Sequence, residues 1–217
     1  MNKYSISADL LKTYYKEPIQ INFSPSLGYR SRCEFGYQNK FYLMHGPDGK
    51  KIYLNTFEIA RPCISSLMPK FLVAINENEL VNKKLFQINF RANSKNEVMT
   101  TLVYHKKLTK DLELAAEKLA SQFNIQLIIR ARKEFYSNKD GLLEDLVDGT
   151  NVTLYQTDQS FYQPNHFMMP RMVRKVIDMV ENPKDLLELY CGSGTFTLPL
   201  SNYFNKVFAT ENNRQSI

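Results

Sequence analysis

Residues 186–211 have the types and spacing needed to hold a ligand that carries a ribose. The apolar run 186–190 leads into Cys191-Gly192-Ser193-Gly194-Thr195, and a second apolar run, 207–210, ends at Glu211. In a strand-turn-helix-strand unit, the turn glycines let a ligand approach the backbone, and an acid about 20 residues later accepts hydrogen bonds from ribose hydroxyls. The separation of Gly192 and Glu211 fits that spacing. The alternative interpretation is a plain glycine turn between strand and helix.

The same turn favours S-adenosylmethionine over a dinucleotide. A dinucleotide fingerprint has a third glycine, here expected near Thr197, where helix and strand close against a pyrophosphate. This sequence has no glycine there. S-adenosylmethionine carries no pyrophosphate, so the looser turn suffices. We predict that residues 185–217 form the first βαβ unit of an incomplete Rossmann-like methyltransferase domain.

The preceding residues, 1–165, predict an α+β domain with an antiparallel sheet and helices. Residues 30–35 alternate in polarity, which places Arg30, Arg32 and Glu34 on one sheet face. The turn sequence Pro47-Asp48-Gly49 predicts a hairpin. Further strands are expected at residues 85–91, 98–104 and 125–129, the first two joined as a hairpin.

Two of the predicted helices have different roles. Thr109 is a suitable cap for a helix with apolar residues at helical spacing from Leu112 to Phe123. Residues 166–184 are expected to form a connecting helix, with Pro170 in its first turn and Pro183 at its end. That helix would join the α+β domain to the glycine-turn unit.

The composition is that of a globular protein with an affinity for polyanions. Hydrophobic residues make up 43% and charged residues 23% of the 217 residues, and the net charge is +6. Clustered lysine and arginine favour phosphate-bearing partners. No apolar run fits a signal peptide or a membrane span, so we expect a cytoplasmic protein. Cys33, Cys63 and Cys191 fit neither a disulfide framework nor the spacing of a metal or iron-sulfur site.

Four motifs in order resemble the tRNA (uracil-5-)-methyltransferase family. They are Leu187-Glu188-Leu189-Tyr190-Cys191-Gly192-Ser193-Gly194, Ser160-Phe161-Tyr162-Gln163-Pro164-Asn165, Lys84-Leu85-Phe86-Gln87-Ile88, and Leu102-Val103-Tyr104-His105-Lys106-Lys107-Leu108. The resemblance spans roughly residues 20–217. It implies a protein that uses S-adenosylmethionine to convert uridine 54 in the tRNA T-loop to 5-methyluridine.

The resemblance also implies that the catalytic residues lie outside this chain. In that family a cysteine adds to C6 of uracil, C5 takes the methyl group, and a base removes the C5 proton. Addition is needed because C5 is a poor nucleophile until C6 is attacked. The family motifs for the cysteine and the base would follow Ile217, and none of the three cysteines here stands in such a motif. We therefore expect the chain alone to be inactive.

The residues implied for the methyl donor come from three segments. By resemblance, Gln163 contacts the donor, Tyr190 and Thr195 line the turn with Gly192 and Gly194, and Glu211 holds the ribose. Position 195 departs from the family pattern, which has Asn there, and a hydroxyl offers one donor where an amide offers two. The alternative for Gln163 is a cap on the helix that begins near Asn165.

Five residues are implied for RNA. Arg30 and Arg32 would contact phosphate or stack on a base, and Phe86, His105 and Phe161 would lie near the T-loop. Aromatic and basic side chains together suit an unpaired loop whose bases are splayed out. Methylation also requires an extruded base. The alternatives are structural: Phe86 and Phe161 in the core, His105 at a strand end, and Lys106-Lys107 on a solvated edge.

Two other functions remain open at this point. One is a non-catalytic module that binds or folds tRNA, in which the half Rossmann unit serves only for packing. The other is a relative that acts on ribosomal RNA, which would be expected to carry a cluster of four cysteines that this sequence lacks. The partner implied by the resemblance is the tRNA T-arm, and we expect a monomer for the complete protein, with no metal and no membrane.

Overall fold

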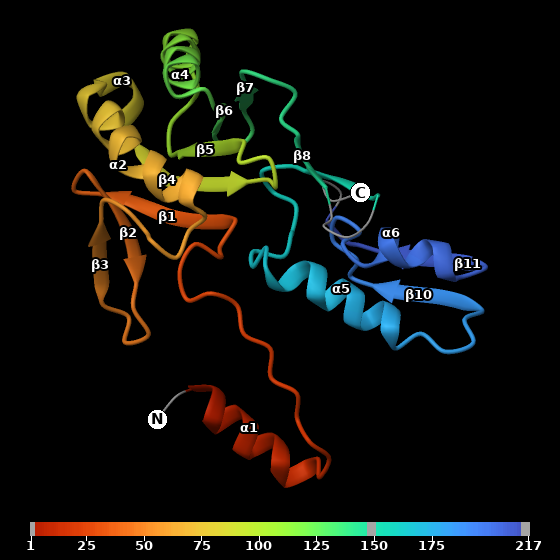
Figure 1. The fold of residues 1–217 in the computed structure, drawn as a ribbon. Coiled ribbons are helices and arrows are strands. Elements are labelled where there is room, and N and C mark those ends of the chain that lie inside the picture. The colour runs from red at the N-terminus through yellow and green to blue at the C-terminus, as the bar shows by residue number, and fades with distance from the viewer. Residues whose placement is uncertain (1–2, 147–150, 214–217) are drawn as a thin grey trace.

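The computed structural model describes residues 3–146 and 151–213, and a mixed sheet is its main element (Figure 1). The sheet has seven strands in the order β3-β2-β1-β4-β5-β6-β7. Their bounds are β1 Arg32–Gln38, β2 Phe41–His45, β3 Lys51–Leu54, β4 Leu85–Ala92, β5 Val98–Tyr104, β6 Gln126–Arg130 and β7 Phe135–Ser137.

Helices cover one face of this sheet. They are α2 (Pro62–Glu77), α3 (Glu79–Asn82) and α4 (Lys110–Phe123), which lie together on one side in Figure 1. Phe35, Ile88 and Phe90 point from β1 and β4 into the core beneath them. The predicted cap is confirmed, because Thr109 Oγ1 accepts the Leu112 N–H at 3.3 Å. Helix α4 ends at Asn124, whose left-handed φ of 50° closes the last turn.

The opposite face of β1 and β4 is polar. Arg32 pairs with Arg91 and Glu34 pairs with Asn89 across the two strands. Residues directly opposite in an antiparallel pair share a face, so the alternation predicted for residues 30–35 is confirmed for Arg32 and Glu34. Arg30 lies just before β1, in an isolated bridge to Ala60 and Asn165.

The prediction of an antiparallel sheet is wrong for one pair of strands. Strands β5 and β6 are parallel, with Met99 opposite Gln126 and Val103 opposite Arg130. The physical reason is the connection between them. Helix α4 carries the chain back along the sheet, so β6 starts again at the same end as β5.

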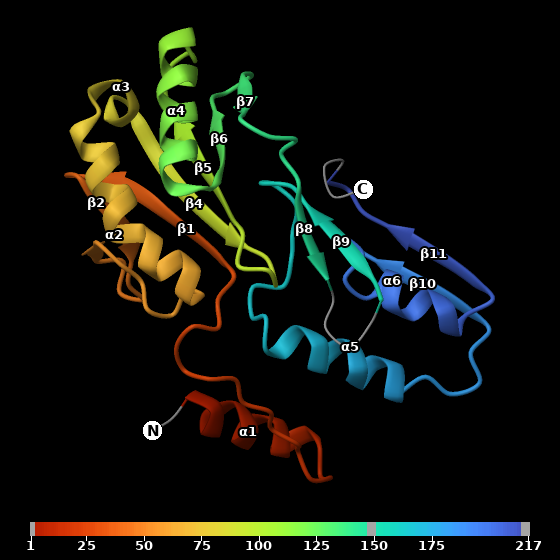
Figure 2. The ribbon, with the colours of Figure 1, turned by 45° about the horizontal axis from the view of Figure 1, so that its top comes forward.

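The remaining elements lie on the other side of the sheet from α2 and α4 (Figure 2). A two-stranded hairpin of β8 (Leu143–Leu146) and β9 (Thr153–Gln156) precedes α5 (Met168–Asp178). Two parallel strands follow, β10 (Asp185–Leu189) and β11 (Lys206–Thr210), with α6 (Thr197–Leu200) and the 3-10 helix η1 (Ser201–Tyr203) between them.

Helix α5 is shorter than the predicted connecting helix. Asn165 Oδ1 accepts the N–H groups of Phe167 and Met168, at 3.2 and 3.1 Å, so the helix starts before Pro170. It ends at Asp178, ahead of Pro183, and Asn182 takes a left-handed φ of 48°. A small cluster of Leu154, Tyr162, Met169 and Val173 joins β9, the loop after it and α5.

Helix α1 (Lys3–Tyr14) was not predicted from the sequence. It lies apart from the sheet in Figures 1 and 2, joined to it by an extended segment. Leu10, Leu11 and Tyr14 are exposed on it. These apolar side chains are therefore not packed against the core of the sheet.

Candidate functional site

The turn after β10 is built around two glycines in left-handed conformations. Gly192 has φ +59° and Gly194 has φ +78°. A Cβ at Gly192 would stand 3.4 Å from the Phe161 carbonyl oxygen, and one at Gly194 would stand 3.2 Å from Leu198 Cγ. Glycine is favoured at both positions because a side chain is strained at positive φ, and at Gly194 a Cβ would also crowd Leu198. Tyr190 also has a positive φ, +59°, although it carries a side chain.

Glu211 closes this turn from the end of β11. Its Oε2 accepts the Gly192 N–H at 2.8 Å, and its Oε1 accepts the N–H groups of Asn213 and Asn212 at 2.8 and 2.9 Å. The hydrogen bonds from Asn213 and then Gly192 lower the pKa of the Glu211 carboxyl group from its ordinary value. Glu211 is therefore held as an ionised acceptor at neutral pH.

A hollow of about 240 Å³ opens at this end of β10 and β11, and Tyr190 and Glu211 both line it. The side chain of Tyr190 is exposed, whereas Thr195 is only 5% exposed and is not in the lining. Gly192 and Gly194 are buried beneath the turn. The structure thus brings Tyr190 and Glu211 together over the glycine turn and places Thr195 below it.

Gln163 lies on another segment, residues 159–164, and does not line this hollow. The Phe161 carbonyl oxygen accepts a hydrogen bond from Ser193 Oγ at 2.8 Å, so this segment lies directly against the glycine turn. The helix cap near Gln163 is supplied by Asn165. Within the described residues, the Gln163 side chain makes no hydrogen bond.

The other side of this segment borders a cavity of about 310 Å³. Arg30, Arg32 and Phe161 all line it, together with Glu34, Tyr162 and Pro164. Arg32 forms an ion pair with Glu34, and Arg30 Nε donates to the Arg32 carbonyl oxygen at 2.9 Å. The Phe161 side chain is 54% exposed, so the core alternative for it is wrong. Three of the five residues implied for RNA therefore meet in one cavity.

The other two, Phe86 and His105, lie together at the far end of β4. Their rings stack with centroids 4.2 Å apart and an interplanar angle of 19°. Phe86 is 48% exposed, so it is not a core residue. Phe86 lies about 17 Å along β4 from Arg91, at about 3.3 Å per residue. Arg91 pairs with Arg32 on the neighbouring strand. The implied RNA residues thus form two groups.

A buried arginine that the sequence reasoning missed anchors the segment between the sheet and the glycine turn. Arg91 is 3% exposed, and its Nη2 donates to the carbonyl oxygens of Ser160 and Asp158 at 2.5 and 3.2 Å. Burial, and then nearby Arg32, lower the Arg91 pKa to about 10, so it stays protonated at neutral pH. Arg130 adds a two-point ion pair to the Asp158 carboxylate, with both distances 2.8 Å. No local sequence pattern marks a charged strand residue as buried.

The cysteine thiols are not activated. Burial raises the pKa of Cys33 to about 12, and it also raises the pKa of Cys63 and of Cys191. A nucleophilic cysteine needs a lowered pKa, because the thiolate is the reactive form. Among the described residues, no three His, Cys, Asp or Glu side chains gather as a metal site, and no helix is long and apolar enough to cross a membrane.

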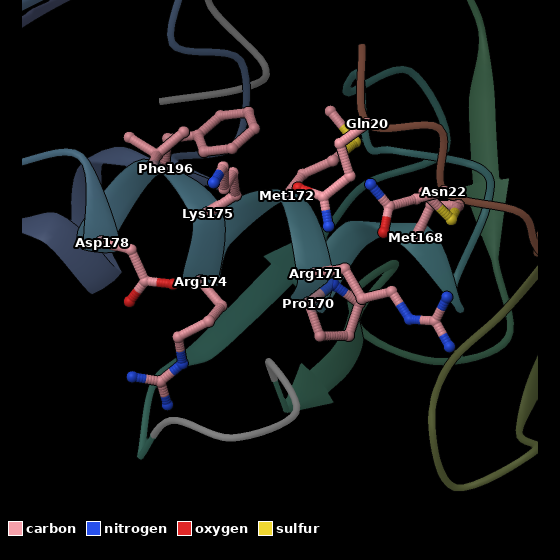
Figure 3. Close-up of a pocket in the computed structure, with 11 residues that line it drawn as sticks. Gln20, Asn22, Met168, Pro170, Arg171, Met172, Arg174, Lys175, Asp178 and Phe196 are labelled. Atoms are coloured by element: carbon pink, nitrogen blue, oxygen red, sulfur yellow. The ribbon is translucent and has the colours of Figure 1, made fainter. Parts of the chain in front are cut away.

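A further hollow, of about 770 Å³, runs along α5 (Figure 3). Gln20 and Asn22 of the N-terminal segment border it, as does Phe196, the residue just before α6. The helix contributes the cations Arg171, Arg174 and Lys175. None of the residues implied by the motifs lines this hollow, so it is separate from the site described above.

The fold and site define a class of protein: an α+β body with basic and aromatic side chains, followed by a parallel strand pair with a glycine turn and a terminal acid. The family model described as tRNA (Uracil-5-)-methyltransferase matches residues 1–217. The chain belongs to this family.

Individual relatives agree with the family match. A tRNA/tmRNA (uracil-C(5))-methyltransferase of Saccharophagus degradans is 36% identical over 226 residues, covering 100% of this chain and 62% of the relative. One of Campylobacter concisus is 35% identical, covering 98% of this chain and 61% of the relative. The chain thus spans about three fifths of the length of these relatives.

A solved structure shares the fold. It is the tRNA (uracil-54, C5)-methyltransferase of Pyrococcus abyssi, in complex with S-adenosyl-L-homocysteine. Its TM-score to this chain is 0.76 at 17% sequence identity, and the match covers 98% of this chain and 57% of that protein. At this identity the likeness concerns the fold.

Proposed function

We propose that this chain forms the donor-binding and RNA-binding part of a methyltransferase that uses S-adenosylmethionine to make 5-methyluridine at position 54 of the tRNA T-loop. In this proposal residues 1–165 bind the T-arm, residues 166–184 connect, and residues 185–217 begin the Rossmann-like methyltransferase domain. The names of the relatives support uracil C5 in tRNA as the target. We propose a cytoplasmic location, where tRNA is available, and a monomer for the complete protein.

One observation carries the proposal: residues 159–164 contact both halves of the site. The carbonyl oxygen of Phe161 accepts a hydrogen bond from Ser193 in the glycine turn, and Phe161 also lines the cavity of Arg30 and Arg32. A methyltransferase must bring a donor and an acceptor base together, because positioning supplies much of the rate acceleration. A segment shared between the two sites meets that requirement.

The glycine turn fits part of the methyl donor. S-adenosylmethionine would supply an electrophilic methyl group. Glu211 is an ionised acceptor beside a hollow of about 240 Å³, suited to the ribose hydroxyls. Complete ligand pockets are larger, roughly 300–1,000 Å³, so this hollow matches one end of the donor. Tyr190 and the backbone of Gly192 border that end, and Gln163 approaches from the neighbouring segment.

The two groups of RNA residues fit different parts of an unpaired loop. Arg30 and Arg32 beside the exposed ring of Phe161 suit a phosphate and an extruded base. The stacked pair Phe86 and His105 suits a second base, because aromatic rings bind nucleobases by stacking. The separation of about 17 Å along β4 then requires an RNA segment of several nucleotides to reach both groups.

The proposal makes a definite prediction for the 217-residue chain. It should bind the donor and a T-arm hairpin and transfer no methyl group, since the pKa values of all three cysteines are raised and none can attack C6 as a thiolate. Binding is measured by calorimetric titration with S-adenosylmethionine and by a filter assay with the hairpin. Transfer is measured with a labelled donor.

Variants of one acid test the donor site. Glu211→Gln should weaken donor binding by about tenfold to 100-fold, the effect of losing a hydrogen bond to a charged group. Glu181→Gln, at an exposed position outside the turn, is the matched control. Equal affinities for the two variants would contradict the donor site. Methyl transfer by the chain itself would contradict the reasoning on the cysteines, and tighter binding of a ribosomal RNA hairpin would contradict tRNA as the target.

A further inference from the structure

A basic groove of about 900 Å³ opens where β5 and β6 end. Its walls are residues 103–107, at the end of β5, and residues 130–134, at the end of β6. Because these two strands are parallel and α4 crosses between them, the loops that follow them meet at one edge of the sheet. Crevices at the carboxyl ends of parallel strands are frequent ligand sites. The groove is separate from both the glycine turn and the cavity of Arg30 and Arg32.

The groove has an excess of positive charge. Five of its ten lining residues are lysine or arginine, and one is acidic. The acid, Glu134, is engaged, because its Oε2 accepts the Leu108 N–H at 2.6 Å. Lys83 adds to the positive potential here, since burial and then Lys83 lower the pKa of Lys106. The groove therefore attracts anions.

The cations in the groove divide into anchored and available groups. Lys106 Nζ donates to the Leu80 carbonyl oxygen at 2.8 Å and lies over the Tyr104 ring, and Arg130 is paired with Asp158. In contrast, the exposed side chains of Lys107, Arg132 and Lys133 make no hydrogen bond or ion pair within the described part of the chain. These three cations are free to meet a ligand.

The groove is continuous with the stacked aromatic pair. His105 lines the groove and also stacks on Phe86. Free cations beside exposed aromatic rings are typical of sites that bind single-stranded nucleic acid. A base stacks on the rings, and the cations contact the phosphates of the backbone.

We propose that this groove binds the phosphate backbone of the RNA next to the base that stacks on Phe86 and His105, with Arg132, Lys133 and Lys107 as its phosphate contacts. The inference rests on the proposed function, since it assigns a second contact surface for the same RNA. It extends the RNA surface from β4 and β5 onto the loop that follows β6.

The test compares two double variants of equal charge change. Arg132→Ala with Lys133→Ala removes two free cations of the groove, and Lys70→Ala with Lys118→Ala removes two exposed cations from α2 and α4 as the control. Binding of the 217-residue chain to a fluorescent T-arm hairpin is measured by anisotropy from low to high salt. Thermal unfolding of each variant checks the fold.

Counterion release sets the expected size of the effect. Each phosphate contact contributes about 0.7–0.9 to the slope of log affinity against log salt, which is about five- to eightfold in affinity at 0.1 M salt. The groove variant should therefore bind on the order of 30-fold more weakly, with a slope shallower by about 1.4–1.8. The control should keep both values of the unmodified chain.

The outcomes separate this inference from the proposed function. If the unmodified chain prefers the T-arm hairpin and the groove variant matches the control, the groove proposal is wrong and the proposed function stands. If the unmodified chain binds the T-arm hairpin and unrelated hairpins equally well and the groove variant binds all of them more weakly, the groove is supported and the T-arm as target is not. If the unmodified chain binds no RNA, both are wrong.

Discussion

Replacing Arg91 should destabilise the protein and detach the segment shared by the two halves of the site. Its guanidinium group is the main polar link from β4 to residues 156–160: it donates to the carbonyl oxygens of Ser160 and Asp158 and, at 3.4 Å, to Gln156 Oε1. Because Arg91 is buried, water cannot replace these bonds after the side chain is removed.

The expected magnitude follows from the groups left without partners. In Arg91→Met, which keeps much of the apolar volume, the buried carbonyl of Ser160 and the part-buried carbonyl of Asp158 lose their donor, at about 1–3 kcal/mol for each unsatisfied group. The free energy of unfolding should fall by about 3–5 kcal/mol, a large part of the 5–15 kcal/mol typical of a domain. Arg91→Lys keeps the charge and a single donor nitrogen, so its free energy of unfolding should fall less. Arg32→Ala, which breaks an exposed ion pair, should cost at most about 1 kcal/mol.

Urea unfolding of the three variants measures these differences. The slope of unfolding free energy against urea concentration should be the same for all of them, because a changed slope would indicate a changed unfolded state. Donor and RNA binding are then measured under conditions in which every variant is folded. Arg91→Met should weaken both, because residues 159–164 contact both the glycine turn and the arginine cavity. A loss of less than 1 kcal/mol, or unchanged affinity for both ligands, would refute the reasoning about the anchor.

Two further predictions concern the glycine turn. The pKa of Glu211 is lowered in the folded protein, so its hydrogen bonds contribute stability at pH values above the ordinary pKa of 4.5, and this contribution is lost as the pH falls through the lowered value. Urea unfolding at pH values on either side of that lowered pKa should show that Glu211→Gln loses less unfolding free energy on acidification than the unmodified chain. An equal loss in the two proteins would contradict the stabilising role of these hydrogen bonds. Gly192→Ala and Gly49→Ala each place a side chain at positive φ, which costs about 1 kcal/mol or more, but only the first meets Phe161. Titration should therefore find weaker donor binding for Gly192→Ala alone, and a loss in both variants would show that the contact with Phe161 is unimportant.

Local patterns in the sequence were sufficient for several elements of the fold. Alternation placed Arg32 and Glu34 on one face, and Thr109 was recognised as a helix cap because its hydroxyl and the apolar stripe after it are close in sequence. The parallel pairing of β5 and β6 was missed. Strand direction depends on where α4 returns the chain, and no residue within the strands records that.

The candidate site was predicted in part for the same reason. Gly192 and Glu211 belong to a known spacing, and they are joined by a hydrogen bond in the structure. Arg91 and the free cations Arg132 and Lys133 were not singled out, because their importance depends on segments that are distant in sequence. The run Arg130-Ala131-Arg132-Lys133 after a strand was the available signal for the groove.

The contact of residues 159–164 with both the glycine turn and the arginine cavity has a thermodynamic consequence. Under the proposed function, a first ligand that further restricts this segment would leave less conformational entropy for the second ligand to remove. Such coupling is reciprocal, so the factor by which the donor raises the affinity for RNA equals the factor by which RNA raises the affinity for the donor. Ser193, Phe161 and Arg91 are the residues through which that free energy would pass.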